Sequence, residues 1–280
     1  MKKFKLAMII ATMTLVAVSC GSKNTQKDEK PKALVLYYSQ TSNTKIVAQE
    51  IAKSLDADLE EIVPLKPYDG DFDATIARCL QEREQGIETE IKPIAADLSK
   101  YETIFIGYPV WFGTYAPPVA TFLKQTDLSG KNLVPFCTFG SGGLVSSSKD
   151  MAKAQPNAHI QPGYGVRAER LQAVPKEVDQ FLKAGKYIEG EYNDPGDFTE
   201  QHPVTEEEAA IFDAAVKGYK MLNAKAETVG ERAIPEGKEY LFIAVDLPRE
   251  DAPDMPPAGM MKVYVTVANG EAPVFTQVVR

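Results

Sequence analysis

Short, continuously apolar runs alternate with amphipathic stretches from residue 33 onward. The first run, residues 33–38 (ALVLYY), is apolar throughout, as expected of a parallel strand covered on both faces. The stretch after it places Val47, Ile51 and Leu55 four residues apart, on one face of a helix. Further strands are expected at 58–63, 103–108, 133–138 and 165–168, with helices at 72–85, 119–124, 147–154 and 175–184. This alternation predicts a five-stranded open parallel sheet with right-handed crossovers, whose ligands bind beyond the carboxyl ends of the strands.

The remainder of the chain has a different pattern, which predicts a smaller α+β domain at residues 204–280. Residues 187–203 are rich in Gly, Asp and Pro and are interpreted as a linker. Thr205 and Glu208 have the spacing of a capping box, so a helix is expected over 207–222. Strands are then expected at 225–232, 238–246, 261–268 and 273–279, with Asn269 and Gly270 as a hairpin signal between the last two.

The N-terminus has the features of an export signal. Three early lysines precede a short apolar run that ends in small residues before Cys20, and the run is too short to cross a bilayer as a helix. Residues 1–20 resemble a bacterial lipoprotein signal, which implies lipidation of Cys20 and anchoring in the cell envelope, on the periplasmic or surface side. An ordinary cleaved signal peptide with an incidental cysteine is the alternative. Residues 21–31 are polar and without periodicity, as in a flexible tether.

Charge and composition exclude several classes of function. The formal net charge of −8 argues against a nucleic-acid partner, which would require a basic face. Cys79 and Cys137 fall in separate expected elements and are interpreted as buried small hydrophobes rather than a disulfide framework. The two histidines, His159 and His202, lie outside the expected site loops, which argues against His-dependent triads and typical zinc sites.

The loop after the first strand is the most specific candidate site. Its residues are Ser39, Gln40, Thr41, Ser42, Asn43 and Thr44, and a helix follows at once. Hydroxyl groups and backbone N–H groups at a helix N-terminus form an anion site without any lysine or arginine, and a phosphate monoester fits it. A capped strand-to-helix turn with no ligand is the alternative.

Two further loops follow strands of the same sheet. The loop after the third strand lies between two glycines and holds the only tryptophan of the chain, which can stack on a flat heteroaromatic ring. Its candidate residues are Pro109, Val110, Trp111, Phe112 and Gly113. The loop after the fourth strand is glycine-rich, and its candidates are Thr138, Phe139, Gly140, Gly142 and Gly143.

These motifs resemble those of the flavodoxin family over residues 32–186. The first loop is similar to the pattern Ser/Thr-x-Thr-Gly-Asn-Thr, with Ser42 in place of the glycine, and the second to Gly-x-Pro-(Ile/Val)-Trp-x-Gly. The resemblance implies a parallel sheet of order 2-1-3-4-5 with FMN as cofactor: the second loop borders the isoalloxazine ring, and backbone N–H groups of the third approach its O2/N1/N3 edge. The absence of a Gly-x-Gly-x-x-Gly fingerprint favours FMN over FAD.

The C-terminal domain resembles the cystatin-like fold, but residues 233–237 keep only the glycine of the inhibitory Gln-x-Val-x-Gly loop.

Two functions remain in competition at this point. The first is an FMN-binding redox protein, either an electron carrier or a flavin-dependent reductase, with a redox partner that the sequence does not identify. The second is a non-catalytic envelope binding module that keeps the fold and has lost the flavin. The serine at position 42 and the expected export of the chain both favour the second. Glycine usually supplies a positive φ or a close approach to phosphate, and the first function requires FMN in the compartment to which the chain is exported.

Overall fold

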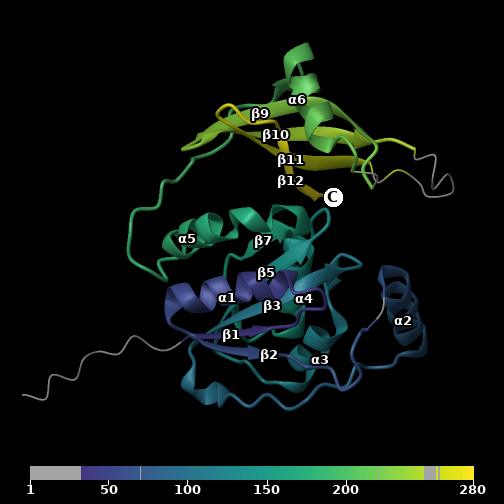
Figure 1. The fold of residues 1–280 in the computed structure, drawn as a ribbon, viewed down its shortest axis with the longest axis vertical. Helices are drawn as coiled ribbons and strands as arrows, with labels where there is room; N and C mark the ends of the chain where they lie inside the picture. Colours follow the sequence, from purple (N-terminus) through teal and green to yellow (C-terminus); the bar gives the residue numbers. More distant parts are fainter. Residues whose placement is uncertain (1–32, 70, 220, 249–256, 258) are drawn as a thin grey trace, which may run out of the picture. The chain divides into compact units, whose positions relative to one another are not determined.

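The computed structural model describes residues 33–69, 71–219, 221–248, 257 and 259–280 (Figure 1). The expected export signal, lipidation site and tether lie outside the described residues. In the part of the chain that is described, no helix combines the length and the apolar character needed to cross a membrane.

The first sheet is parallel and has the expected strand order. Four of its strands are β1 (Ala33–Tyr37), β2 (Asp58–Glu61), β3 (Thr103–Trp111) and β5 (Asn132–Phe139), in the spatial order β2-β1-β3-β5, with β2 at the edge. The fifth position is shared by two short strands, β6 (His159–Ile160) and β7 (Tyr164–Arg167), which pair with successive parts of β5. Read as five positions, this is the predicted order 2-1-3-4-5.

Helices cover both faces of this sheet because its strands carry apolar residues on both sides. On one face, Val35 and Phe105 pack against α1 (Asn43–Leu55) and α5 (Val174–Ala184), which Figure 1 shows on the same side. On the other face, Leu36 and Ile106 pack in a cluster with residues of α3 (Pro117–Gln125) and α4 (Leu144–Ala154). The alternation along β1 thus divides one continuous apolar run between two cores. The remaining elements are α2 (Phe72–Gln85), the short helices η1 (Leu98–Lys100) and η2 (Ala168–Ala173), and β4 (Thr114–Tyr115).

The C-terminal residues form a second, antiparallel sheet with one helix packed on it. Its strands are β8 (His202–Pro203), β9 (Ala224–Ile234), β10 (Gly237–Asp246), β11 (Met260–Ala268) and β12 (Val274–Val279), in the order β12-β11-β10-β9-β8. The helix, α6 (Glu206–Val216), begins with the predicted capping box and contributes Phe212 to the core of this sheet. The resemblance to the cystatin-like fold stays a prediction.

Two expectations for this region are corrected. The helix expected to reach residue 222 ends at Val216, and Gly218 follows it with a positive φ of 82°. The end of the expected linker is not free, because β8 pairs with β9 and the Thr199 N–H donates to the Glu231 carbonyl at 2.8 Å. The edge of β9 thus supplies hydrogen-bond partners that local composition does not reveal.

Candidate functional site

The first loop begins where β1 ends and leads into α1. Ser42 is the N-cap of α1, with φ 68° and ψ −4°, so the serine adopts the left-handed conformation that a glycine would supply. The Ser39 hydroxyl accepts a hydrogen bond from the Lys45 N–H at 3.3 Å and so caps the first turn. Thr41 and Ser42 are exposed at this turn. Exposed hydroxyls beside helix N–H groups are what an anion site requires.

Gln40 has a different role from its neighbours in the first loop. Its side-chain amide donates to the Tyr68 carbonyl at 3.0 Å and to the Thr75 hydroxyl at 2.6 Å. The amide therefore ties the loop to α2 and the segment before it. The side-chain N–H groups of Gln40 are thus used within the protein.

The second loop is a β-hairpin, which corrects the expectation of a loop beginning at Gly107. Strand β3 continues to Trp111, because Tyr108 and Pro109 still pair with β5 and the next two residues pair with β4. The turn consists of Phe112 and Gly113, with φ values of 52° and 81°. Positive φ at both central residues is the geometry that fits the twist of a two-residue hairpin.

The hairpin places its two aromatic side chains in different environments. The Trp111 ring packs nearly perpendicular to the rings of Tyr38 and Tyr68, with centroids 5.8 Å and 5.2 Å away. Phe112 is 52% exposed at the tip, and the Arg83 guanidinium lies 5.6 Å from the centre of its ring. Trp111 is therefore partly a core residue, and Phe112 is the more accessible aromatic surface.

The third loop follows β5, which contains Thr138 and Phe139, and leads through Gly140 and Gly142 to Gly143, the N-cap of α4. Gly143 has a φ of 126°, and a Cβ there would lie 2.5 Å from a methyl group of Val110. Glycine is required at this position for both reasons, since the backbone comes against the hairpin.

Specific contacts bring the three loops together. The buried hydroxyls of Thr44 and Thr138 lie 2.8 Å apart and join the first loop to the end of β5. The Ser146 hydroxyl in the first turn of α4 donates to the Gly113 carbonyl of the hairpin at 2.5 Å. The predicted site residues thus converge at the carboxyl edge of the parallel sheet, where ligands of such sheets bind.

Sequence reasoning missed Tyr38, Tyr68 and Ser146. Tyr68 was assigned to no element, yet its hydroxyl donates to Glu82 at 2.5 Å and the Arg78 guanidinium lies 3.7 Å from its ring centre. Burial, reinforced by the hydrogen bond to Glu82, raises the pKa of Tyr68. Ser146 directly follows the glycine-rich loop in a short helix, a position from which its contact to the hairpin could have been suspected.

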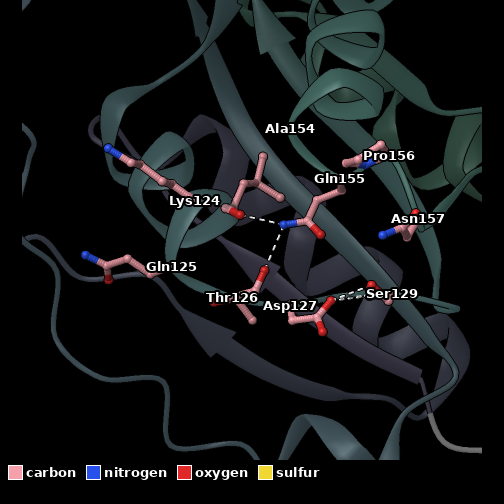
Figure 2. Close-up of a pocket in the computed structure, with 10 residues that line it drawn as sticks. Lys124, Gln125, Thr126, Asp127, Ser129, Ala154, Gln155, Pro156 and Asn157 are labelled. Atoms are coloured by element: carbon pink, nitrogen blue, oxygen red, sulfur yellow. Dashed lines mark hydrogen bonds between the residues drawn. The ribbon is translucent and has the colours of Figure 1, made fainter.

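A hollow of about 390 Å³ lies away from these loops, where α3 and α4 end (Figure 2). Gln155 lines it, and its amide donates to the Leu123 carbonyl at 2.5 Å and the Thr126 carbonyl at 2.8 Å (Figure 2). These bonds satisfy carbonyl groups at the end of α3, which have no partner within the helix. The hollow borders the amino end of β5, so it is separate from the three-loop site and has a structural explanation.

The doubly wound sheet and the loops at its carboxyl edge define a class of α/β protein, and the comparisons with known proteins identify the family. The family model described as Flavodoxin matches residues 32–178, more than half of the sequence. The chain therefore belongs to the flavodoxin family.

Solved structures with likeness to the chain include three flavoproteins or candidate flavoproteins. A candidate flavoprotein of Bacteroides eggerthii is 27% identical, with 55% of this chain and 96% of that chain covered and a TM-score of 0.49. A second, from Bacteroides uniformis, is 26% identical over 53% of this chain and 97% of its own, with a TM-score of 0.47. A flavoprotein of Lactobacillus acidophilus, solved in complex with FMN, is 27% identical over 52% of this chain and 98% of its own, with a TM-score of 0.43.

Proposed function

We propose that the chain is an FMN-binding redox protein that holds its flavin at the three converging loops. The observation that carries the proposal is the junction of the loops through the Thr44–Thr138 hydroxyl pair and the contact of Gly143 with the hairpin. Each loop alone is weak evidence, but together they offer an anion site, an aromatic surface and a glycine-rich backbone with accessible N–H groups at one edge of the sheet.

The proposed binding mode assigns each loop one part of the cofactor. The N-terminus of α1, with the exposed hydroxyls of Thr41 and Ser42, holds the terminal phosphate. Phe112 and the accessible part of Trp111 contact the isoalloxazine ring, and the backbone of residues 140–143 faces its polar edge. When bound, FMN supplies one- and two-electron transfer, while the protein orients the ring and excludes water from it.

The conformation of Ser42 bears on the competing function, a binding module without flavin. One of the two arguments for that function is the replacement of the family glycine; the other is the expected export of the chain. Because Ser42 adopts φ 68°, the turn keeps the left-handed geometry with serine in place. This supports flavin binding and removes one of the two reasons for the alternative.

A titration with FMN, riboflavin and FAD tests the proposal. The protein consists of residues 21–280, which retains the whole compact unit Pro31–Arg280. We expect FMN fluorescence to be quenched with a Kd of micromolar or below, and riboflavin, which lacks the phosphate, to bind at least about tenfold more weakly, because charge-assisted contacts are the strong ones. Absence of quenching at tens of micromolar protein, or equal affinity for riboflavin, would contradict it.

We also propose that the protein is exported and lipidated at Cys20, with the described residues held at the cell envelope by residues 21–31. The small residues before Cys20 and the short apolar run support this. Full-length wild type and Cys20→Ala are expressed in a bacterial host and fractionated. We expect the wild type in the membrane fraction and the variant outside it; equal distribution of the two would contradict lipidation.

A further inference from the structure

The C-terminal sheet touches the parallel-sheet unit at the third loop. The Val278 N–H donates to the Ser141 carbonyl at 2.7 Å, from the outer side of the edge strand β12. Arg167, at the end of β7, donates through Nε to the Gly140 carbonyl at 2.7 Å and through Nη1 to the Phe275 carbonyl at 3.1 Å. One arginine thus bridges the glycine-rich loop and β12.

The buried guanidinium of Arg167 is in contact with aromatic rings, a carboxylate and backbone carbonyls. Its side chain is buried, with the guanidinium 4.3 Å from the ring centre of Phe275 and 4.9 Å from that of Tyr219. Its Nη2 lies 3.2 Å from the Glu169 carboxylate. Burial of a guanidinium is tolerated when its donors are paired and its faces are covered by aromatic rings. The contacts with Phe275 and Tyr219 are made only when the C-terminal domain is in place.

The anchored carbonyls fix the direction of the neighbouring N–H groups. A trans peptide is planar, so the N–H of residue i+1 points opposite to the carbonyl of residue i. With the carbonyls of Gly140 and Ser141 bound to Arg167 and β12, the N–H groups of Ser141 and Gly142 point away from those acceptor contacts. A side chain at position 142 would overlap the Val278 carbonyl, so the contact also requires Gly142 to be glycine.

We propose that the C-terminal domain is an intramolecular positioning element for the flavin-ring loop, with Arg167 as its positioning residue. The inference rests on the proposed function. A glycine-rich loop loses more conformational freedom on ordering than any other sequence, and that loss opposes ligand binding. Docking of β12 orders the loop in advance, so the flavin meets a pre-formed set of N–H donors. By thermodynamic reciprocity, bound FMN stabilises the docked domain by the same factor.

Two variants and a matched control test this role. Arg167→Gln removes the bridge. Val278→Pro removes the N–H that reaches the loop and also changes a side chain in the core of the C-terminal sheet; proline is tolerated on an edge strand when the N–H it lacks would face outward. Arg232→Gln is the control, because Arg232 also joins a carbonyl, a carboxylate and an aromatic ring, but within the C-terminal region. Far-UV circular dichroism establishes that each variant is folded.

Amide hydrogen exchange of residues 141–143 is measured without flavin, and FMN affinity is measured in parallel on residues 21–280. We expect both variants to exchange faster at the loop and to bind FMN about 5- to 100-fold more weakly, the range of ordinary coupling, with the control unchanged. FMN is expected to slow exchange in β12 of the wild type.

Faster exchange at residues 141–143 of the two variants with unaltered FMN affinity would overturn the inference, as would unaltered exchange at these residues. A wild-type chain that takes up no FMN contradicts the proposed function instead, and the flavin-free exchange still decides whether the domain holds the loop.

Discussion

At the scale of single residues, Ser42 combines a left-handed backbone with a place in the proposed phosphate loop. The left-handed conformation costs a non-glycine residue roughly 1–2 kcal/mol, partly offset because glycine also gains freedom in the unfolded chain. We predict that Ser42→Gly raises the free energy of unfolding by 0 to about 1 kcal/mol and weakens FMN binding, because it removes one of the hydroxyls proposed to hold the phosphate. Asp56→Gly, at φ 50° after α1, is the control for the strain alone. Chemical denaturation measures the stability of the two variants, and FMN titration measures the affinity of Ser42→Gly. A lower free energy of unfolding in Ser42→Gly would show that the serine hydroxyl stabilises the loop by more than the backbone strain costs.

The buried hydroxyl pair of Thr44 and Thr138 gives a second prediction. Replacing one threonine by valine leaves the other hydroxyl without its partner in a buried place, at a cost of about 1–3 kcal/mol. The double variant should be less destabilised than the sum of the single variants, because it removes both polar groups. A double-mutant cycle by denaturant unfolding measures the difference; strictly additive effects would show that the two loops are not coupled through this pair.

The two described cysteines are predicted to be unreactive in the native protein. Both side chains are buried, and burial raises the pKa of Cys79 to about 11. A thiol with a raised pKa contributes stability below its unfolded value of 9.0, and that contribution is lost as pH rises through the folded value. On residues 21–280, which lack Cys20, a thiol reagent at pH 8 should label neither cysteine until denaturant is added. Rapid native labelling would contradict their burial.

At the scale of elements, the hairpin β3–β4 places a packed aromatic ring, Trp111, next to an exposed one, Phe112. Trp111→Ala should lower the free energy of unfolding by about 2–4 kcal/mol, because it removes a ring packed against Tyr38 and Tyr68. Phe112→Ala should change it by less than about 0.5 kcal/mol, as an exposed side chain, and should weaken FMN binding. Unfolding curves and FMN titration of the two variants test this; unchanged flavin affinity in Phe112→Ala would remove it from the ring site.

The elements that sequence predicted best are those with a strong local cause. The apolar run of β1, the amphipathic face of α1 and the Thr205 capping box each depend on near neighbours, and all three are present. The hairpin turn at Phe112 and Gly113 was missed because a bulky aromatic is unusual at positive φ. Strand β8 was missed because its partner lies some 25 residues further along the chain, where only tertiary pairing reveals it.

At the scale of the whole molecule, sequence predicted two sheets but not the contact between them. Arg167 lies at the end of a short strand, and nothing in its neighbourhood indicates that its partners are Gly140 and Phe275. The convergence of the three loops could be predicted, because carboxyl ends of parallel strands meet at one edge. Docking of a second domain follows no such rule, so the role of Arg167 could be recognised only in the structure.

The contact between the C-terminal domain and the parallel-sheet domain should weaken at acidic pH. The ion pair of Lys176 with Glu236 joins α5 to the turn between β9 and β10, and protonation of Glu236 breaks it. The hydrogen bond from Lys176 holds the pKa of Glu236 below its ordinary 4.5. The pair therefore stabilises the docked state above pH 4.5, and this contribution, no more than about 1 kcal/mol for a partly exposed pair, is lost as pH falls through the folded pKa. The protection factors of residues 141–143, which correct for the intrinsic pH dependence of amide exchange, should fall in that window, and Glu236→Gln should reduce this change. An identical dependence in the variant would exclude this pair as its cause.

Backbone amide shift mapping tests the three-loop site most directly. FMN is added to isotope-labelled residues 21–280, and amide and indole N–H signals are followed by NMR. We predict shift changes concentrated at residues 40–45, at the Trp111 indole and at residues 140–143, with the α1 N-terminal signals unaffected by riboflavin. Changes centred on the hollow beside Gln155, or none in the three loops at saturating FMN, would contradict the account.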